Sequence, residues 1–281
     1  MTPFEATTVH GLEALRITAP GGATALVTHH GAHVLSWVPA AGDERLYLSE
    51  RAVYASGKAI RGGIPVIFPQ FGTLGPLTRH GFARILPWTL DTTREGEDYA
   101  LATWRLDSDA ATRAEWPHEF RAELTVNVGS AQLDVELDIE NTGGDSFAFT
   151  AALHTYLRVR EIENALVTGL ENTKYRDQRE GGAKRTETGE TFSLEGPVDR
   201  IHVDVPPRLI LSESGRQTLI ESSGFPDVVI WNPWEAGNAA TADMAALDFR
   251  RMLCVEAAAV ATPVALAAGA EWFGRQSLMV F

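Results

Sequence analysis

The 281-residue sequence predicts an all-β protein: a large antiparallel β-sandwich that spans residues 1–281 as a single domain. Short runs of β-branched and aromatic residues alternate with glycine and proline turn signals along most of the chain. Residues 133–140 alternate between aliphatic and acidic side chains, which is the pattern of a strand with one buried and one solvated face. The sequence contains no repeat, linker or long segment of helical period, and a sandwich of this size is commonly one domain.

The expected strands follow one another along the chain. In order, they are residues 14–19, 23–29, 32–39, 87–93, 99–106, 120–128, 132–140, 147–159, 208–214, 216–222, 227–234, 252–260 and 265–281. Three neighbouring pairs are joined by short polar or glycine-containing connections, which predicts three hairpins: 87–93 with 99–106, 120–128 with 132–140, and 208–214 with 216–222. Residues 147–159 are apolar enough to form a strand buried on both faces. We expect a short helix near residues 241–250.

Three histidines lie close together in the motif HHGAH: His29, His30 and His33. If this segment is a strand, His29 and His33 share one face and His30 points away. No carboxylate nearby in the sequence completes a set of metal ligands. We therefore expect these histidines to be polar residues at the rim of a sheet rather than a metal site.

Composition restricts the possible partners and location. The net charge of −13 disfavours nucleic acid or an anionic membrane as a partner, and we expect a monomer. The single cysteine, Cys254, excludes an internal disulfide and a cysteine zinc site, and its apolar neighbours indicate a buried, inert thiol. The sequence shows no charged-then-apolar leader and no apolar run of about 18 residues, which predicts a cytosolic protein. The motifs of serine hydrolases, P-loop proteins and dinucleotide-binding proteins are missing.

The segment 61–84, RGGIPVIFPQFGTLGPLTRHGFAR, reverses the acidic character of the chain. It carries Arg61, Arg79, His80 and Arg84 and contains no acidic residue. Its five glycines and three prolines predict a fixed, irregular backbone. Guanidinium groups held on such a backbone are suited to bidentate capture of a phosphate or a carboxylate. The alternative is a loop with three surface arginines.

Two ionisable residues lie within apolar strands: His154 in AALHTYL and Glu256 in MLCVEAAAV. Burying a carboxylate among such neighbours is costly, so Glu256 is expected to face a cleft or to have a partner. A histidine in a core is often structural, but an imidazole and a carboxylate together can form a general acid–base pair. A glycosidase pair of Glu256 with Asp199 is also conceivable. Three tryptophans could stack on a sugar, although core positions are more usual for them: Trp231, Trp234 and Trp272.

Six segments of the chain resemble the aldose 1-epimerase (mutarotase) superfamily, and in particular its glucose-6-phosphate 1-epimerase branch. The matching segments occur in the family's order: RGGIPVIFPQFG (61–72), HGFAR (80–84), LHTYLRV (153–159), VDRIH (198–202), VIWNPW (229–234) and MLCVEAA (252–258). The resemblance implies a galactose mutarotase-like β-supersandwich with an open cleft and with neither a metal nor an organic cofactor.

The resemblance also assigns roles to residues. It implies that His154 and Glu256 are catalytic and that Asp199 contacts the sugar. The phosphate-side arginines of the family fall on Arg61 and Arg84. His80 belongs to the matching segment HGFAR and is expected to bind substrate with them. Arg79 departs from the family pattern, in which an uncharged polar residue is usual, and it could strengthen phosphate capture or face solvent.

The activity implied by the resemblance is isomerisation between the α and β anomers of a hexose 6-phosphate, with glucose 6-phosphate as the expected substrate. On this interpretation Glu256 removes the proton of the anomeric hydroxyl while His154 protonates the ring oxygen. Two alternatives remain open on the sequence. One is a non-catalytic module that binds sugar phosphates, and the other is a mutarotase for unphosphorylated aldoses.

Overall fold

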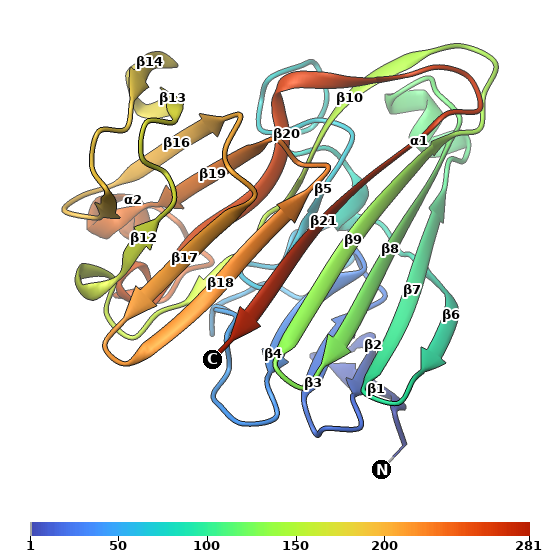
Figure 1. Ribbon diagram of the computed structural model, residues 1–281. Coiled ribbons are helices and arrows are strands. Elements are labelled where there is room, and N and C mark those ends of the chain that lie inside the picture. The colour runs from blue at the N-terminus through green and yellow to red at the C-terminus, as the bar shows by residue number, and fades with distance from the viewer. Residues whose placement is uncertain (1) are drawn as a thin grey trace.

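The computed structural model describes residues 2–281, and these form an almost entirely β architecture (Figure 1). Across this part of the chain, antiparallel pairing builds sheets of four, eight and nine strands. The nine-stranded sheet faces the viewer in Figure 1, and the four-stranded sheet lies behind it. The main core cluster takes side chains from all three sheets, among them Val27, Leu137 and Val255. The predicted antiparallel β-sandwich is confirmed.

The bounds and order of the strands define each sheet. The four-stranded sheet runs β1 (Phe4–Val9), β2 (Leu12–Thr18), β3 (Thr24–Thr28), β4 (His33–Val38). The eight-stranded sheet runs β14 (Ala183–Thr186), β13 (Lys174–Asp177), β16 (Val198–Val203), β19 (Asp227–Asn232), β20 (Met252–Leu266), β10 (Phe147–Leu153), β5 (Val66–Ile67), with β11 (Tyr156–Arg158) also pairing with β20. The nine-stranded sheet runs β15 (Thr191–Ser193), β12 (Leu166–Thr168), β17 (Arg208–Glu213), β18 (Arg216–Ser223), β21 (Glu271–Val280), β9 (Gln132–Asn141), β8 (Phe120–Gly129), β7 (Tyr99–Asp107), β6 (Thr89–Glu95).

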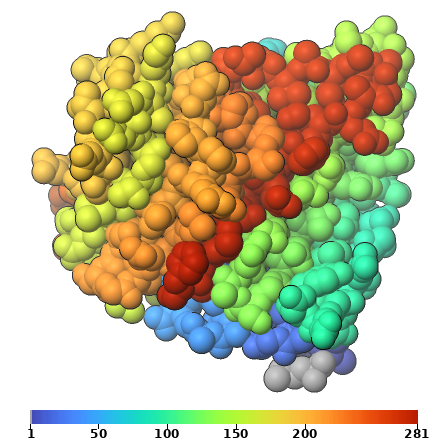
Figure 2. All heavy atoms as spheres, viewed as in Figure 1, coloured from blue at the N-terminus to red at the C-terminus, as the bar shows by residue number. Residues whose placement is uncertain are grey.

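The three predicted hairpins form as β6–β7, β8–β9 and β17–β18. In β9 every aliphatic residue of the alternating pattern is buried, and the acidic residues between them are half-exposed. The space-filling view shows one broad face of the molecule, on which β21 (red) runs between β18 (orange) and β9 (green) (Figure 2). The acidic side chains of β9 therefore place part of the negative charge on a solvated face of the sheet.

The helical elements are short, and the predicted helix near residues 241–250 is misplaced. The helices are α1 (Ala110–Glu115), α2 (Trp234–Ala239) and the 3₁₀ turns η1 (Ala83–Ile85), η2 (Ile162–Asn164), η3 (Gln178–Glu180) and η4 (Asp248–Arg251). Helix α2 begins earlier because Pro233 precedes it and the Asn232 side chain accepts a hydrogen bond from the Trp234 amide at 2.8 Å. Residues 241–247 form turns instead, and Leu247 adopts a left-handed conformation (φ 67°) that stops a helix from continuing. No helix among residues 2–281 is long and apolar enough to cross a membrane.

Residues 29–32 of the HHGAH segment form the turn between β3 and β4, and His33 is the first residue of β4. His29 and His33 therefore do not share one strand, which corrects the expected shared face. His29 Nδ1 accepts a hydrogen bond from the Trp104 indole at 2.8 Å. The His30 and His33 rings donate to the carbonyls of Lys58 and Gly62, each at 2.7 Å. His30 and His33 are buried, not at a rim. These contacts give all three histidines a structural role in holding neighbouring loops against the sheet.

Candidate active site

A pocket of about 460 Å³ gathers all seven site residues that the sequence singled out. The seven are Arg61, Arg79, His80, Arg84, His154, Asp199 and Glu256. The first four lie in the segment 61–84, His154 lies in the break between β10 and β11, Asp199 lies on β16, and Glu256 lies on β20. A pocket of this volume is in the range that holds a small molecule.

His154 and Glu256 face each other because of the register of three strands. The run 147–159 is interrupted at His154 and Thr155, which separates β10 from β11 and corrects the expected single strand. Strands β10 and β11 both pair with β20, and the register is the same on either side of the break. His154, between them, therefore lies opposite Glu256. The His154 amide turns away from β20 and donates to the Pro65 carbonyl at 3.0 Å. The break therefore attaches the part of the chain that carries His154 to the segment 61–84.

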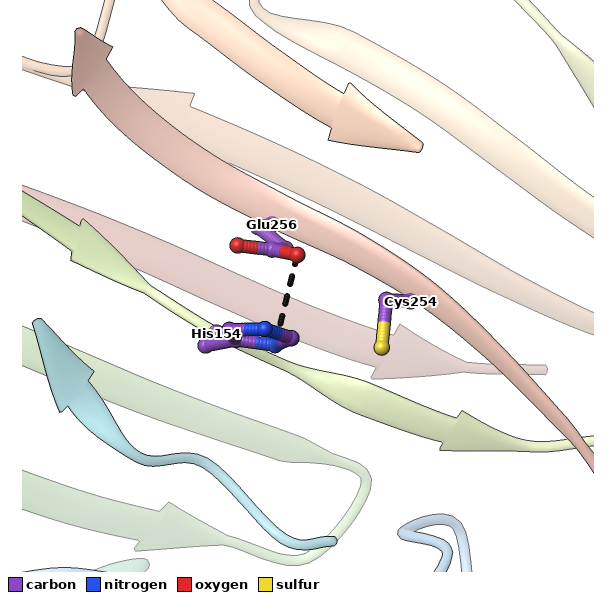
Figure 3. A group of neighbouring side chains, drawn as sticks. All are labelled: His154, Cys254 and Glu256. Atoms are coloured by element: carbon purple, nitrogen blue, oxygen red, sulfur yellow. Dashed lines mark ion pairs between the residues drawn. The ribbon is translucent and has the colours of Figure 1, made fainter. Parts of the chain in front are cut away.

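The two side chains form a close and almost dry pair (Figure 3). His154 Nδ1 lies 3.3 Å from Glu256 Oε1, and the residues are 7% and 1% exposed. The distance is that of an ion pair, but the angles do not make it a hydrogen bond. Among residues 2–281, neither His154 Nδ1 nor Glu256 Oε2 has a hydrogen-bond partner. Both groups are thus free to exchange protons with a bound molecule.

Burial shifts the pKa values of the pair in opposite directions. Loss of solvation raises the pKa of Glu256 well above its usual value, with Asp199 adding to the rise and Arg84 opposing it. Loss of solvation also lowers the pKa of His154, and His80 and the nearby arginines add to the decrease. A raised pKa makes Glu256 a stronger base when it is ionised, and a lowered pKa makes His154 a stronger acid when it is protonated.

Three guanidinium groups face the same pocket, and their neighbours differ. Arg61 forms an ion pair with Asp243 at 3.2 Å and donates to the Tyr156 hydroxyl at 2.9 Å. Arg84 donates only to the Arg79 backbone carbonyl, at 3.0 Å. Within the described residues neither Arg79 nor Arg84 has a carboxylate partner closer than 4.0 Å. Burial lowers the pKa of Arg84 to about 10; Tyr156 partly offsets this, and the other two arginines add to it. The pocket therefore holds uncompensated positive charge.

Glycines fix the backbone that carries Arg61. Gly62 and Gly63 have φ angles of 111° and 62°, which side chains rarely tolerate. A Cβ atom on Gly62 would lie 2.4 Å from the Tyr47 carbonyl oxygen, and one on Gly63 would lie 2.2 Å from that of Val34. The backbone here packs against two other segments so closely that only glycine fits. Arg61 is consequently positioned by a rigid turn, as the composition of the segment predicted.

His80 is neutral and can donate a hydrogen bond from one of its two ring nitrogens. Its Nδ1 accepts a hydrogen bond from the Gly72 amide at 3.2 Å, so its proton resides on Nε2. Burial and the adjacent arginines, Arg84 first, lower the pKa of His80 to about 3. The ring lies 5.5 Å from that of His154, edge to face. Such an imidazole can donate to an uncharged oxygen in the pocket without changing its own charge.

Asp199 enters the pocket from β16, where it pairs with Trp231 of β19. Burial raises its pKa to about 6, and the positive charge of Arg79 partly opposes the shift. Of the three tryptophans considered from the sequence, only Trp231 lines this pocket. Trp234 packs on Phe249, and Trp272 packs on two phenylalanines of the core.

Tyr156 was not identified from the sequence, although it belongs to the same wall of the pocket. Its ring stacks on His154 with centroids 4.8 Å apart and an interplanar angle of 7°. Its hydroxyl accepts the hydrogen bond from Arg61. The spacing of two residues from His154 was the available signal, because alternate residues of an extended segment share a face. Tyr156 thus contacts both His154 and Arg61.

Comparison with known proteins shows which family the chain belongs to. The family model described as aldose 1-epimerase matches residues 13–279. A protein of Cenchrus ciliaris with the provisional name glucose-6-phosphate 1-epimerase is 36% identical over 281 residues, covering 96% of this chain and 85% of that protein. A protein of Escherichia coli with the same provisional name is 34% identical over 232 residues, covering 81% and 77%.

Solved structures agree. A Salmonella typhimurium protein (YeaD), provisionally described as a mutarotase, superposes with a TM-score of 0.92 at 28% identity, covering 100% of this chain and 94% of its own. Galactose 1-epimerase of Lactobacillus acidophilus superposes with a TM-score of 0.74 at 12% identity, covering 99% and 98%. At 12% identity the likeness concerns the fold alone, and it agrees with the expected galactose mutarotase-like architecture.

Proposed function

The chain belongs to the aldose 1-epimerase family, and from that premise we propose that it interconverts the α and β anomers of a hexose 6-phosphate. It is an enzyme of the mutarotase type, and glucose 6-phosphate is the substrate we propose. The observation that carries the proposal is one pocket in which a dry acid–base pair, His154 and Glu256, lies near two arginines, Arg79 and Arg84, that have no carboxylate partner among residues 2–281. The first feature suits ring opening and the second suits a phosphate.

Ring opening requires two proton transfers on the oxygens attached to the anomeric carbon. Glu256 takes the proton of the anomeric hydroxyl, and His154 gives a proton to the ring oxygen. The bond between the anomeric carbon and the ring oxygen breaks, and the anomeric carbon becomes an aldehyde. After rotation about the C1–C2 bond, His154 takes its proton back, Glu256 returns the other, and the ring closes as the opposite anomer. Protons balance over the cycle without any co-reactant.

The pKa shifts favour these transfers. The cycle begins with Glu256 ionised and His154 protonated, and at the aldehyde stage both groups are neutral. Burial raises the pKa of Glu256 and lowers the pKa of His154, so burial favours the neutral forms. The dry pocket thereby stabilises the pair in the state that accompanies the open-chain sugar. General acid–base catalysis of this kind contributes about 10²–10⁴-fold.

The remaining residues hold the sugar. We assign Arg84 and Arg79 to the phosphate, because they face the pocket without carboxylate partners. His80 donates its Nε2 proton to a sugar oxygen, and Asp199 accepts hydrogen bonds from sugar hydroxyls. Binding energy from the phosphate end can be used to orient the distant reacting carbon. Monomeric state and cytosolic location remain predictions made from the sequence, as does the single domain over residues 1–281.

Anomer exchange measured by NMR on equilibrated glucose 6-phosphate tests the proposal. The protein should accelerate exchange above the rate in buffer, and Glu256→Gln should remove at least about 99% of the acceleration. Glu136→Gln serves as the matched control, because it makes the same chemical change on the half-exposed face of β9. Exchange at the buffer rate with the unmodified protein, while calorimetry still detects binding of the sugar phosphate, would leave only a non-catalytic binding module.

One contact favours a second candidate, a mutarotase for unphosphorylated aldoses. Arg61 already has a carboxylate partner in Asp243, so it is less available to a phosphate than the sequence suggested. Exchange rates measured on glucose and on glucose 6-phosphate at equal concentration separate the two candidates. A preference for glucose would transfer the assignment to free sugars.

A further inference from the structure

Cys254 lies beside the catalytic pair, and the proposed mechanism does not use it. It is the single cysteine of the chain and is fully buried. Because it precedes Glu256 by two residues on β20, the two side chains project from the same face of the strand. Figure 3 shows both of them projecting from the side of β20 on which His154 lies, with the Glu256 carboxylate directed at the His154 ring and the Cys254 thiol to one side of it. A thiol, an imidazole and a carboxylate thus converge from two neighbouring segments.

The three side chains lie close enough together to serve as a set of metal ligands. A single cysteine excludes zinc sites made of several cysteines, whereas here one thiol is joined by an imidazole and a carboxylate. One potential ligand atom from each residue lies within 4.8 Å of the other two, and all three residues are buried. Two of the ligands have lone pairs that the fold leaves unused, since His154 Nδ1 and Glu256 Oε2 have no hydrogen-bond partner among residues 2–281. Buried polar atoms are normally satisfied, so unsatisfied atoms within one such cluster leave lone pairs for a further partner.

We propose that His154, Cys254 and Glu256 form a binding site for a thiophilic divalent metal ion of the Zn²⁺ class, and that an ion bound there blocks epimerisation. Zn²⁺ accepts sulfur, nitrogen and oxygen ligands together in tetrahedral geometry. Bonds of about 2.0–2.3 Å place tetrahedral ligands roughly 3.5 Å apart. The imidazole and carboxylate already lie 3.3 Å apart, so only the thiol has to move closer, by roughly 1 Å.

The charges of the ligands and the access route fit this ion. Binding displaces the thiol proton to the buffer, and the resulting thiolate and carboxylate balance a dication, which makes burial of the charge feasible. Arg61 and Arg84 lie close enough to act on these ligands, so their repulsion of a cation lowers the affinity of the site. His154 and Glu256 line the pocket, so an ion can enter from solvent, and the fourth coordination position would face the pocket. Mg²⁺ and Ca²⁺ prefer six or more oxygen ligands and do not match a set with one sulfur and one nitrogen. The site is therefore expected to discriminate against hard ions.

The consequence for activity follows from the ligands. A metal ion on the Glu256 carboxylate and the His154 ring occupies the groups that must accept and donate protons. Anomer exchange should therefore stop while the ion is bound and recover when a chelator removes it. Protons should compete with the metal ion for the Cys254 sulfur, because the thiol must lose its proton to bind the ion, so inhibition should weaken as the pH falls.

The test uses the unmodified 281-residue protein with ZnCl₂ as the probe, and Cys254→Ala and Cys254→Ser as variants. We expect the unmodified protein to lose anomer exchange on Zn²⁺ addition, to regain it with EDTA, and to be unaffected by Mg²⁺. Each variant should retain the exchange rate without metal and require at least tenfold more Zn²⁺ for half inhibition. Equal sensitivity of the unmodified protein and both variants would overturn the proposal.

A second readout does not depend on catalysis. Addition of Co²⁺ should produce a thiolate-to-metal charge-transfer absorption in the near ultraviolet with the unmodified protein and none with Cys254→Ala. This measurement distinguishes failure of the metal site from failure of the proposed epimerase activity. A spectrum that shows no thiolate band at saturating Co²⁺ would also overturn the proposal, whatever the effect on exchange.

Discussion

Replacing Arg84 with alanine separates recognition of the phosphate from the chemistry at the anomeric carbon. Its guanidinium is mostly buried and forms one hydrogen bond, to the Arg79 carbonyl at 3.0 Å. The Arg84 Nε has no partner within the described part of the chain. If this group binds the substrate phosphate, its loss should affect the phosphorylated sugar and leave the free sugar unchanged.

The expected size of the effect on activity follows from the strength of the hydrogen bond between the guanidinium and the phosphate. A hydrogen bond to a charged group contributes about 1.5–3 kcal/mol. Since about 1.4 kcal/mol is a factor of ten, kcat/KM for glucose 6-phosphate should decrease about 10- to 100-fold with Arg84→Ala. The value for glucose should change less than twofold. The arginine makes no hydrogen bond to His154 or Glu256, so the geometry of the acid–base pair stays intact. Its charge favours ionised Glu256 but disfavours protonated His154, so its effects on the two members of the reactive pair oppose each other.

The free energy of unfolding should hardly change in Arg84→Ala, so a decrease in activity could not be attributed to unfolding. Folding lowers the pKa of Arg84 to about 10, so at neutral pH the folded state carries a cost for its charge of about 3 kcal/mol. That cost is fully present below about pH 10 and disappears at higher pH, as the guanidinium loses its charge in both states. Removing the side chain relieves it but also removes three buried methylene groups, worth about 0.8 kcal/mol each. The two terms nearly cancel.

The assay is anomer exchange on both sugars together with thermal unfolding. Arg79→Ala is the matched control, because its side chain faces the same pocket but is exposed. We expect a smaller effect for Arg79→Ala than for Arg84→Ala, since a solvated cation contributes less than a buried one. An equal decrease on glucose and glucose 6-phosphate in Arg84→Ala, at an unchanged melting temperature, would refute the assignment of Arg84 to the phosphate.

Three further variants test other parts of the site. Tyr156→Phe keeps the ring stacked on His154 but removes the acceptor for Arg61, so KM for glucose 6-phosphate should rise roughly 2- to 10-fold with little change in kcat. Asp199→Asn should raise KM about 3- to 10-fold at pH 8 and hardly at pH 5. The reason is that burial raises the pKa of Asp199 to about 6, so the carboxyl of the unmodified protein is protonated at pH 5. The measurement is the ratio of the KM values of the two proteins at each pH, because the substrate phosphate titrates equally with both. Glu256→Gln should raise the melting temperature more at pH 8 than at pH 4. Folding raises the pKa of the Glu256 carboxyl, so the unmodified protein loses stability as the pH rises and the variant does not. Equal changes in melting temperature at both pH values would contradict the dry environment of Glu256.

Local pattern was sufficient to predict the regular strands. In β9 the aliphatic and acidic residues alternate without exception, and the hairpin with β8 follows because the connection is short. The short strands β12–β16 were not predicted, since segments of three to six residues with mixed polarity give no clear period. Helix α2 was missed because a proline and an asparagine side chain set its start, whereas the expected position rested on composition.

The site was predictable to the extent that its residues stand out from their neighbours. Glu256 is noticeable as an acid among apolar residues, and Arg61 belongs to a segment without acids. The partner of Arg61 could not be foreseen, because Asp243 lies 182 residues away in the chain and belongs to an irregular turn. The break at His154 was equally hidden, since it depends on a hydrogen bond to Pro65 in another segment. Contacts of this kind are products of tertiary packing, which local propensity does not encode.

The three ionisable groups with the largest proposed roles share one property. Folding raises the pKa of Glu256 and of Asp199, and it lowers the pKa of Arg84. In every case the shift opposes the charged form, so the folded protein is less stable for carrying that charge. A structural ion pair would show the reverse, because a partner of opposite sign favours ionisation. Three charged groups that each lower the stability of the fold lie in one pocket. Their presence there is explained if a ligand provides the missing interactions, with its hydroxyls bound to the carboxylates and its phosphate bound to the guanidinium.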